Sequence, residues 1–255
     1  MRTARIKISP AEGEAIYHCT TRTVNDERLL DDSAKETLRK QLWQTADYCG
    51  LQILNYAILP DHFHVLVRVP SAAKIPDDEI LRRHHGMYPK PVLRRAARLR
   101  AIEVRLKDGD PKAAAWRKRQ LACMGDISQF MKMLKQRYVH WFNRSHQRRG
   151  TLWPERFKSL IIEPKVRVLK AVSVSIDLNC VRAGLAANPK DYRFCGYAEA
   201  VAGGESARAG FAHIVGKGKN KQWPAVHAAY SESLFGKARA RPKGTEPKGT
   251  EPEPA

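Results

Sequence analysis

Two histidines, His62 and His64, stand two residues apart within the apolar run from Leu59 to Val67. Successive side chains of a strand point to opposite faces, so both imidazoles leave this segment on the same side. Neutral imidazole is a common ligand of divalent cations, and two at this spacing can bind one ion without straining the strand. The pair therefore predicts a divalent-metal site. A half-exposed strand that carries two histidines by chance is the alternative.

A tyrosine later in the chain could perform chemistry beside such a metal. Tyr138 lies among Lys135, Arg137 and His140, in a segment whose apolar residues repeat with helical spacing. A tyrosine hydroxyl can attack a phosphodiester that a metal polarises, and the phosphotyrosine formed conserves the bond energy for rejoining. Tyr138 is accordingly a candidate nucleophile. On periodicity alone, packing of its ring into the apolar stripe is the favoured interpretation.

The charge of the chain indicates a polyanionic partner. Its 46 Lys and Arg residues against 26 Asp and Glu give a formal net charge of +20, which favours nucleic acid. Between Arg82 and Arg149 there are 19 basic and four acidic residues, with Tyr88, Trp116 and Trp141 interspersed. Such a segment is typical of a groove that follows phosphates while rings stack on bases. A solvated helical surface is the alternative.

Cysteine usage and hydropathy exclude several other classes of protein. The five cysteines are scattered and form no CxxC pair, so neither a zinc ribbon nor a disulfide framework is indicated. Residues 1–10 are basic but lack the apolar core of a signal peptide, and no run approaches the length of a membrane span. We expect a soluble, cytoplasmic, nucleoid-associated protein with no membrane partner.

The elements that must position these residues follow the order strand, helix, strand, strand, helix, strand. Ser33 with Glu36 is the expected cap of the first helix. Strands are expected at 14–23, 51–59, 62–69 and 157–162, and helices at 33–49, 126–142 and 164–178. This order predicts an α+β fold with a ferredoxin-like split βαβ antiparallel sheet and helices on one face. The histidine pair would then lie mid-sheet, where a later helix can cover it.

The domain organisation is expected to be one domain with appendages. Residues 1–202 form the main domain, with a basic helical insertion at about 79–120 that is broken near Pro89, Pro91 and Pro111. Residues 203–235 form a C-terminal extension. Residues 236–255 repeat Pro-Lys-Gly-Thr-Glu, a composition that cannot support a core, so a disordered tail is expected.

Four ordered motifs resemble the REP-associated tyrosine transposases, domesticated relatives of the single-tyrosine HUH transposases of bacterial insertion sequences. They are Tyr17-His18-Cys19, the run Leu59 to Val67, the run Gly150 to Ser159, and the run Asn179 to Leu185. The resemblance covers about residues 14–202. It implies a metal-dependent single-stranded DNA endonuclease and strand transferase that reads hairpins with flanking guide bases, and a homodimer is one candidate assembly.

The resemblance also implies roles for individual residues. The HUH pair falls on His62 and His64, which would hold Mg²⁺ or Mn²⁺, and the nucleophile falls on Tyr138, which would form a 5′-phosphotyrosine. In the insertion-sequence relatives a polar residue about one turn after the tyrosine completes the metal site, but this chain has Phe142 there. The nearest polar substitutes are Asn143 and His140. The candidate DNA contacts are Arg137, Arg144, Arg148, Arg149, Arg156 and Lys158.

Three functions follow from these observations. The first is an enzyme that nicks and rejoins single-stranded DNA at structured repeats. The second is a DNA- or RNA-binding protein that keeps the fold and the basic groove but does not cut. The third is a metal-dependent hydrolytic nuclease in which water replaces the tyrosine. The fate of a labelled hairpin in the presence of Mn²⁺ distinguishes the three.

Overall fold

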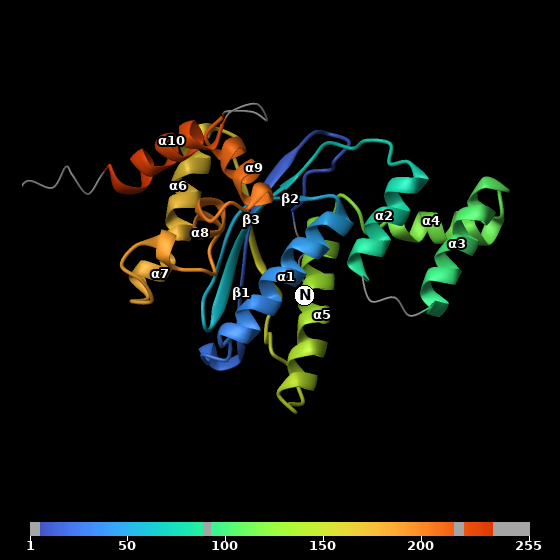
Figure 1. Cartoon of the computed structure of the whole chain (residues 1–255), viewed down its shortest axis with the longest axis horizontal. Helices are drawn as coiled ribbons and strands as arrows, with labels where there is room; N and C mark the ends of the chain where they lie inside the picture. Colours follow the sequence, from blue (N-terminus) through green and yellow to red (C-terminus); the bar gives the residue numbers. More distant parts are fainter. Residues whose placement is uncertain (1–5, 89–92, 217–221, 237–255) are drawn as a thin grey trace, which may run out of the picture.

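The computed structural model describes residues 6–88, 93–216 and 222–236. A central sheet has helices on either side, and a smaller group of helices is set apart from it (Figure 1). None of the described helices is both long and apolar enough to cross a lipid bilayer. The tail predicted to be disordered lies, except for Gly236, outside the described residues.

The sheet has four antiparallel strands in the order β2-β3-β1-β4. They are β1 (Ala15–Arg22), β2 (Gln52–Ile58), β3 (His62–Val69) and β4 (Lys158–Ile162). A tight turn joins β2 to β3, with the amide of Leu59 donating to the carbonyl of His62 at 2.8 Å. This is the strand order of a split βαβ sheet with β1 and β3 in the centre, so the predicted topology is confirmed.

Helices α1 (Asp32–Cys49) and α5 (Ile127–Ser145) lie side by side over one face of the sheet (Figure 1). This is the face of Phe63, whose ring contacts Trp153 with centroids 5.8 Å apart. The cap of α1 is Asp31, whose carboxylate accepts from the amide of Ala34 at 2.7 Å. The expected cap, Ser33, lies instead within the first turn, because the capping residue is two positions earlier.

The other face of the sheet is covered by C-terminal helices. Asn55 of β2 pairs with Leu66, and Leu66 shares a face with His64. The side-chain amide of Asn55 donates to Ser173 Oγ at 2.7 Å. These helices are α6 (Val166–Asp177), α7 (Asn179–Arg182), α8 (Gly196–Val201), α9 (Glu205–Ile214) and α10 (Trp223–Phe235). The expectation of helices on one face is therefore corrected. β2 is buried at nearly every position, and such a strand needs cover on both sides.

Residues 203–235 pack into the same core as the rest of the chain. A Cβ added to Gly210 of α9 would stand 2.5 Å from the carbonyl oxygen of Leu54, so only glycine allows this approach to β2. Phe211 and Tyr230 are fully buried and belong to the same apolar cluster as the sheet. The segment expected to be an extension thus completes the layer over the second face.

The basic insertion consists of three helices beside the end of α1 (Figure 1). They are α2 (Asp77–Met87), α3 (Leu93–Lys107) and α4 (Pro111–Leu121). Pro111 opens α4 behind the cap Asp110, as the predicted break near this proline requires. The breaks expected at Pro89 and Pro91 lie outside the described residues. Short 3-10 helices occur at Val24–Asp26 and Pro189–Asp191.

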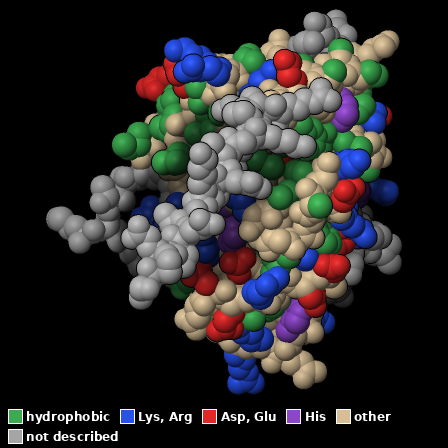
Figure 2. Space-filling model, turned by 90° about the vertical axis from the view of Figure 1, so that its left-hand side faces the viewer, with side chains coloured by type: hydrophobic (Ala, Val, Ile, Leu, Met, Phe, Trp, Pro, Cys, Tyr) green, Lys and Arg blue, Asp and Glu red, His purple; other side chains and the backbone are tan. Residues whose placement is uncertain are grey.

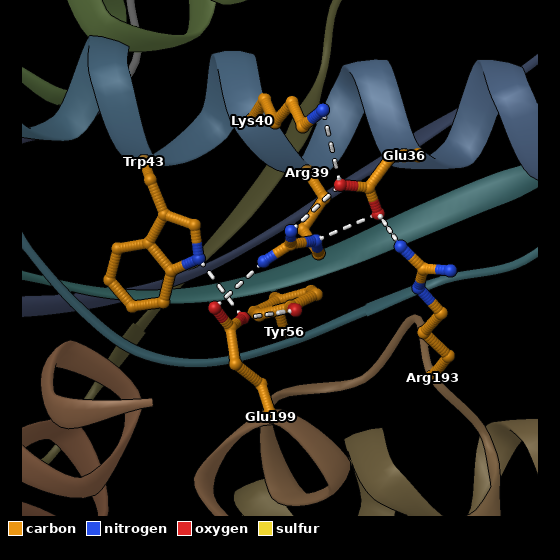
Figure 3. A network of polar contacts seen from close by, with 7 residues as sticks. All are labelled: Glu36, Arg39, Lys40, Trp43, Tyr56, Arg193 and Glu199. Atoms are coloured by element: carbon orange, nitrogen blue, oxygen red, sulfur yellow. Dashed lines mark hydrogen bonds and ion pairs between the residues drawn. The ribbon is translucent and has the colours of Figure 1, made fainter. Parts of the chain in front are cut away.

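A network of charged side chains fastens the C-terminal layer to α1 (Figure 3). Glu199 of α8 accepts from Arg39 of α1 at 2.8 Å and from the hydroxyl of Tyr56 on β2. Arg39 also donates to Glu36, which Arg193 reaches at 3.1 Å from the segment before α8. One carboxylate thus joins three elements at the β2 edge of the sheet.

Candidate metal and nucleic-acid site

The two predicted histidines lie side by side on the sheet, together with a third. The ring centroids of His62 and His64 are 5.1 Å apart on β3. His18, on the neighbouring strand β1, stacks on His64 at 5.2 Å, and its Nε2 is 3.0 Å from Nδ1 of His64. Strand alternation places His18 on the same face as His64 only once the register between β1 and β3 is known.

The surroundings of His64 and His18 favour the neutral form of imidazole, which is the form that binds metals. Burial lowers the pKa of His64 to about 3, with smaller contributions from His18, His62 and Arg22, and burial also lowers the pKa of His18. Both rings are therefore neutral at physiological pH. Neutral imidazole keeps a lone pair for a cation.

Hydrogen bonds also orient both rings. Nδ1 of His62 is 2.8 Å from Asp61 Oδ1, which can accept a hydrogen bond from that nitrogen and leave Nε2 of His62 available. His18 can do the same for His64 by accepting from its Nδ1. Metal-binding histidines commonly have such a second partner. Within the described residues no group of three or more His, Cys, Asp and Glu side chains is arranged to hold an ion, so His62 and His64 would supply two of the ligands and the others would come from outside the protein.

Tyr138 lies on the opposite side of the sheet from these histidines. Its side chain is fully buried, and its hydroxyl donates to the carbonyl of Ala34 at 3.0 Å. Its ring contacts Trp153, which packs on Phe63, and Phe63 points away from the face of His62 and His64. Burial raises the pKa of the phenol. The structure therefore does not bring the expected nucleophile to the expected metal ligands, and its ring packs into the apolar stripe instead.

The other tyrosines are engaged elsewhere in the fold. Tyr88 lies at the end of α2 in the insertion. The remaining hydroxyls bond to other groups: Tyr17 to Ile8, Tyr48 to Gln120, Tyr56 to Glu199, Tyr192 to Ile58, Tyr197 to His227 and Tyr230 to Asp177. All eight tyrosines of the chain lie within the described residues.

The two substitutes expected for the third metal ligand also lie on α5. Asn143 donates its side-chain amide to the carbonyl of Gly150 at 2.9 Å, which closes the loop after the helix. His140 is exposed on the same helix. Because α5 packs against α1 over the Phe63 face, the structure does not group either residue with His62 and His64.

The expected DNA contacts fall into separate places. Arg137 is half-buried and donates to Gln44 Oε1 at 3.2 Å and to the carbonyl of Met87 at 3.3 Å, so it braces α1 and α2. Arg144 and Arg149 are exposed at the end of α5 and in the loop that follows. Arg148, in the same loop, is partly buried.

Arg156 and Lys158 line a pocket of about 380 Å³ whose wall includes residues of β1. Thr20, which pairs with His64, and Arg22, which pairs with His62, form the wall from β1. Thr21, Thr23 and Asn25 add polar groups, and Asp26 and Glu155 add acids. Cations and hydroxyls on the strand that pairs with the two histidines form a setting that suits a phosphate group together with a divalent ion.

Comparison with known proteins identifies the part of the chain that carries these histidines. Residues 12–96 match the family model described as Transposase IS200 like. This segment, about a third of the chain, runs from β1 to the insertion and contains His18, His62 and His64. Over these residues the chain resembles the IS200-like transposases, so the resemblance that the motifs indicated is confirmed.

One solved structure also resembles the chain over most of its length. It is described as a REP-associated tyrosine transposase bound to a REP hairpin. It is 15% identical, with a TM-score of 0.45, and the match covers 80% of this chain and 87% of that one. No curated protein matches the chain significantly.

Proposed function

We propose that this protein binds single-stranded or hairpin DNA, with a divalent cation held by His62 and His64 against a phosphate. The observation that carries the proposal is the pairing of His62 and His64 on β3 with Arg22 and Thr20 on β1, two residues that line the pocket of Arg156 and Lys158. The formal net charge of +20 supports a polyanionic ligand. The match of residues 12–96 to IS200-like transposases supports DNA as that ligand.

The side chains of His62 and His64 are suited to bind Mn²⁺ or Mg²⁺. Nε2 of His62 and Nε2 of His64 would be the protein ligands, while Asp61 and His18 fix the two rings. Imidazole suits Mn²⁺ better than Mg²⁺, which prefers oxygen. When bound, such an ion polarises a phosphate oxygen.

Recognition without a tyrosine-linked intermediate is the function that the geometry supports best. Transesterification by Tyr138 would require its hydroxyl to leave the carbonyl of Ala34 and cross to the other face of the sheet. Metal-dependent hydrolysis is the second candidate. It is favoured by the same imidazoles, because water can take the place of the phenol beside a metal ion.

The test uses a set of labelled single-stranded hairpins incubated with the protein and Mn²⁺. We expect retained complexes on native gels and no DNA attached to protein on denaturing gels. The matched variants are Tyr138→Phe and the double variant His62→Ala/His64→Ala. Cleaved DNA that persists in the tyrosine variant and disappears in the histidine variant would select hydrolysis. A protein-linked product that disappears in Tyr138→Phe would overturn the proposal.

A further inference from the structure

The insertion contains a cavity between aromatic and apolar side chains of its three helices. The cavity measures about 360 Å³ and is lined by His84, Tyr88, Arg98, Leu99, Ile102 and Trp116. The rings of His84 and Trp116 have centroids 5.6 Å apart, and those of His84 and Tyr88 are 5.1 Å apart. Its size falls within the range of roughly 300–1,000 Å³ that is typical of sites for small organic groups.

The helices that form this cavity are rich in basic residues. Residues 93–121 contain ten Lys and Arg against three Asp and Glu. A second cavity of about 340 Å³ shares Arg98, Ile102 and Trp116 with the first, and Arg105 and Lys112 are part of its wall. Two of the acids are already engaged, because Asp110 caps α4 and Glu103 contacts Lys107. The exposed cations therefore exceed the acids that could neutralise them.

The side of the molecule that carries the C-terminal helices has no such excess of basic over acidic side chains among the described residues in view (Figure 2). Acidic and basic side chains are interspersed on the side that carries the C-terminal helices (Figure 2). The concentration of cations beside rings in the insertion is thus a local feature and not a consequence of the net charge alone.

We propose that the α2–α3–α4 insertion is a second binding site for single-stranded DNA, in which an unstacked base enters the cavity at Tyr88 and Trp116. This inference rests on the proposed DNA-binding function and adds a site that lies apart from the histidine face. Every base has a flat face that can stack on a ring, whereas a base within a duplex is already stacked. Arg98 at the shared wall, and Arg105 and Lys112 beyond it, would contact successive phosphates, which favours a strand over a free nucleotide.

The insertion is held firmly enough to serve as a site. Arg117 of α4 pairs with Asp77 of α2, and Gln120 accepts from the hydroxyl of Tyr48 on α1 at 2.7 Å. Arg82 of α2 donates to Asp47 of α1 at 2.8 Å. These contacts fix the cavity relative to the main sheet, so a strand bound there is in a defined position.

The experiment measures anisotropy of a fluorescent 30-nucleotide single strand with the full-length protein in EDTA, which removes any metal contribution. Arg98→Glu/Arg105→Glu should weaken binding tenfold or more and make the dependence of affinity on salt shallower, because each lost phosphate contact lowers that slope by about 0.7. Tyr88→Ala should weaken binding about fivefold or more by loss of stacking. The matched control, Arg167→Glu/Lys190→Glu, has the same change in net charge at exposed sites outside the insertion and should change the affinity less than threefold.

A photo-crosslinking strand that carries 5-iodouracil provides a second readout that does not depend on folding of a variant. Crosslinks should map to Tyr88 or Trp116, and Trp116→Phe should move or remove them. Crosslinks confined to the histidine face, or equal affinity losses for the insertion and control variants, would overturn the inference. Tighter binding of RNA or duplex DNA of the same sequence would also overturn it. If the wild type bound no DNA at all, the proposed function itself would fail, which is a separate outcome.

Discussion

The hydroxyl of Tyr138 donates to the carbonyl oxygen of Ala34 at 3.0 Å, inside the core between α5 and α1. Tyr138 is the only tyrosine that the motifs offered as a nucleophile. The contact holds it on the side of the sheet away from His62 and His64. The phenol therefore contributes to the packing of the two helices. The histidine face has to be understood from its own residues.

Removal of that hydroxyl should affect stability and leave DNA binding intact. Tyr138→Phe removes one hydrogen bond from a buried carbonyl, so we expect the free energy of unfolding to fall by about 1 kcal/mol. Urea denaturation measures this loss. Tyr197→Phe, whose hydroxyl is only partly buried with His227, serves as a control for the same chemical change and should cost less. A loss of DNA affinity in Tyr138→Phe without a loss of stability would contradict the packing role.

The carboxylate of Glu199 should be a major contributor to the attachment of the C-terminal layer. It accepts from Arg39, from Trp43 Nε1 at 3.1 Å and from Tyr56 (Figure 3). Glu199→Gln removes the charge that these donors share, and we expect a loss of about 2 kcal/mol in the free energy of unfolding. Arg193→Gln removes an exposed member of the network and should cost about 0.5 kcal/mol or less. Equal losses for the two variants would show that Glu199 is not the centre of the network.

Asp177 should make stability depend on pH. Burial raises the pKa of this carboxyl to about 7 from its ordinary value of 3.8, although the hydroxyl of Tyr230 donates to it. The native state then holds the proton more tightly than the unfolded chain does. The contribution to stability is complete below about pH 4 and is lost as the pH rises to about 7. Denaturation at a series of pH values should show this decline, and Asp177→Asn should flatten it. An unchanged profile in the variant would assign the decline to other groups.

Sequence patterns predicted the strands and their order because alternation and turn residues are local signals. They also indicated that His62 and His64 share a face, which strand geometry alone requires. The periodicity of α5 likewise showed that Tyr138 lies on an apolar stripe. It could not show which face of the sheet that stripe covers, because this depends on how distant elements pack.

The helical layers on both faces of the sheet have a signal in the sequence of β2. β2 reads as a nearly continuous apolar run, whereas a strand with one exposed face alternates. That run indicates a second helical layer, and the second layer is built from the segment expected to be an extension. The partnership of His18 with His64 depends on the register of β1 against β3, which no single segment determines.

The central claim is that His62 and His64 hold a cation that binds DNA phosphate, and its most direct test is the effect of Mn²⁺ on DNA affinity. Anisotropy titrations of a labelled hairpin should show severalfold tighter binding in Mn²⁺ than in EDTA for the wild type and for Tyr138→Phe. The double variant His62→Ala/His64→Ala should bind equally in both conditions, at the affinity of the wild type in EDTA. An undiminished Mn²⁺ effect in the histidine variant would contradict the account.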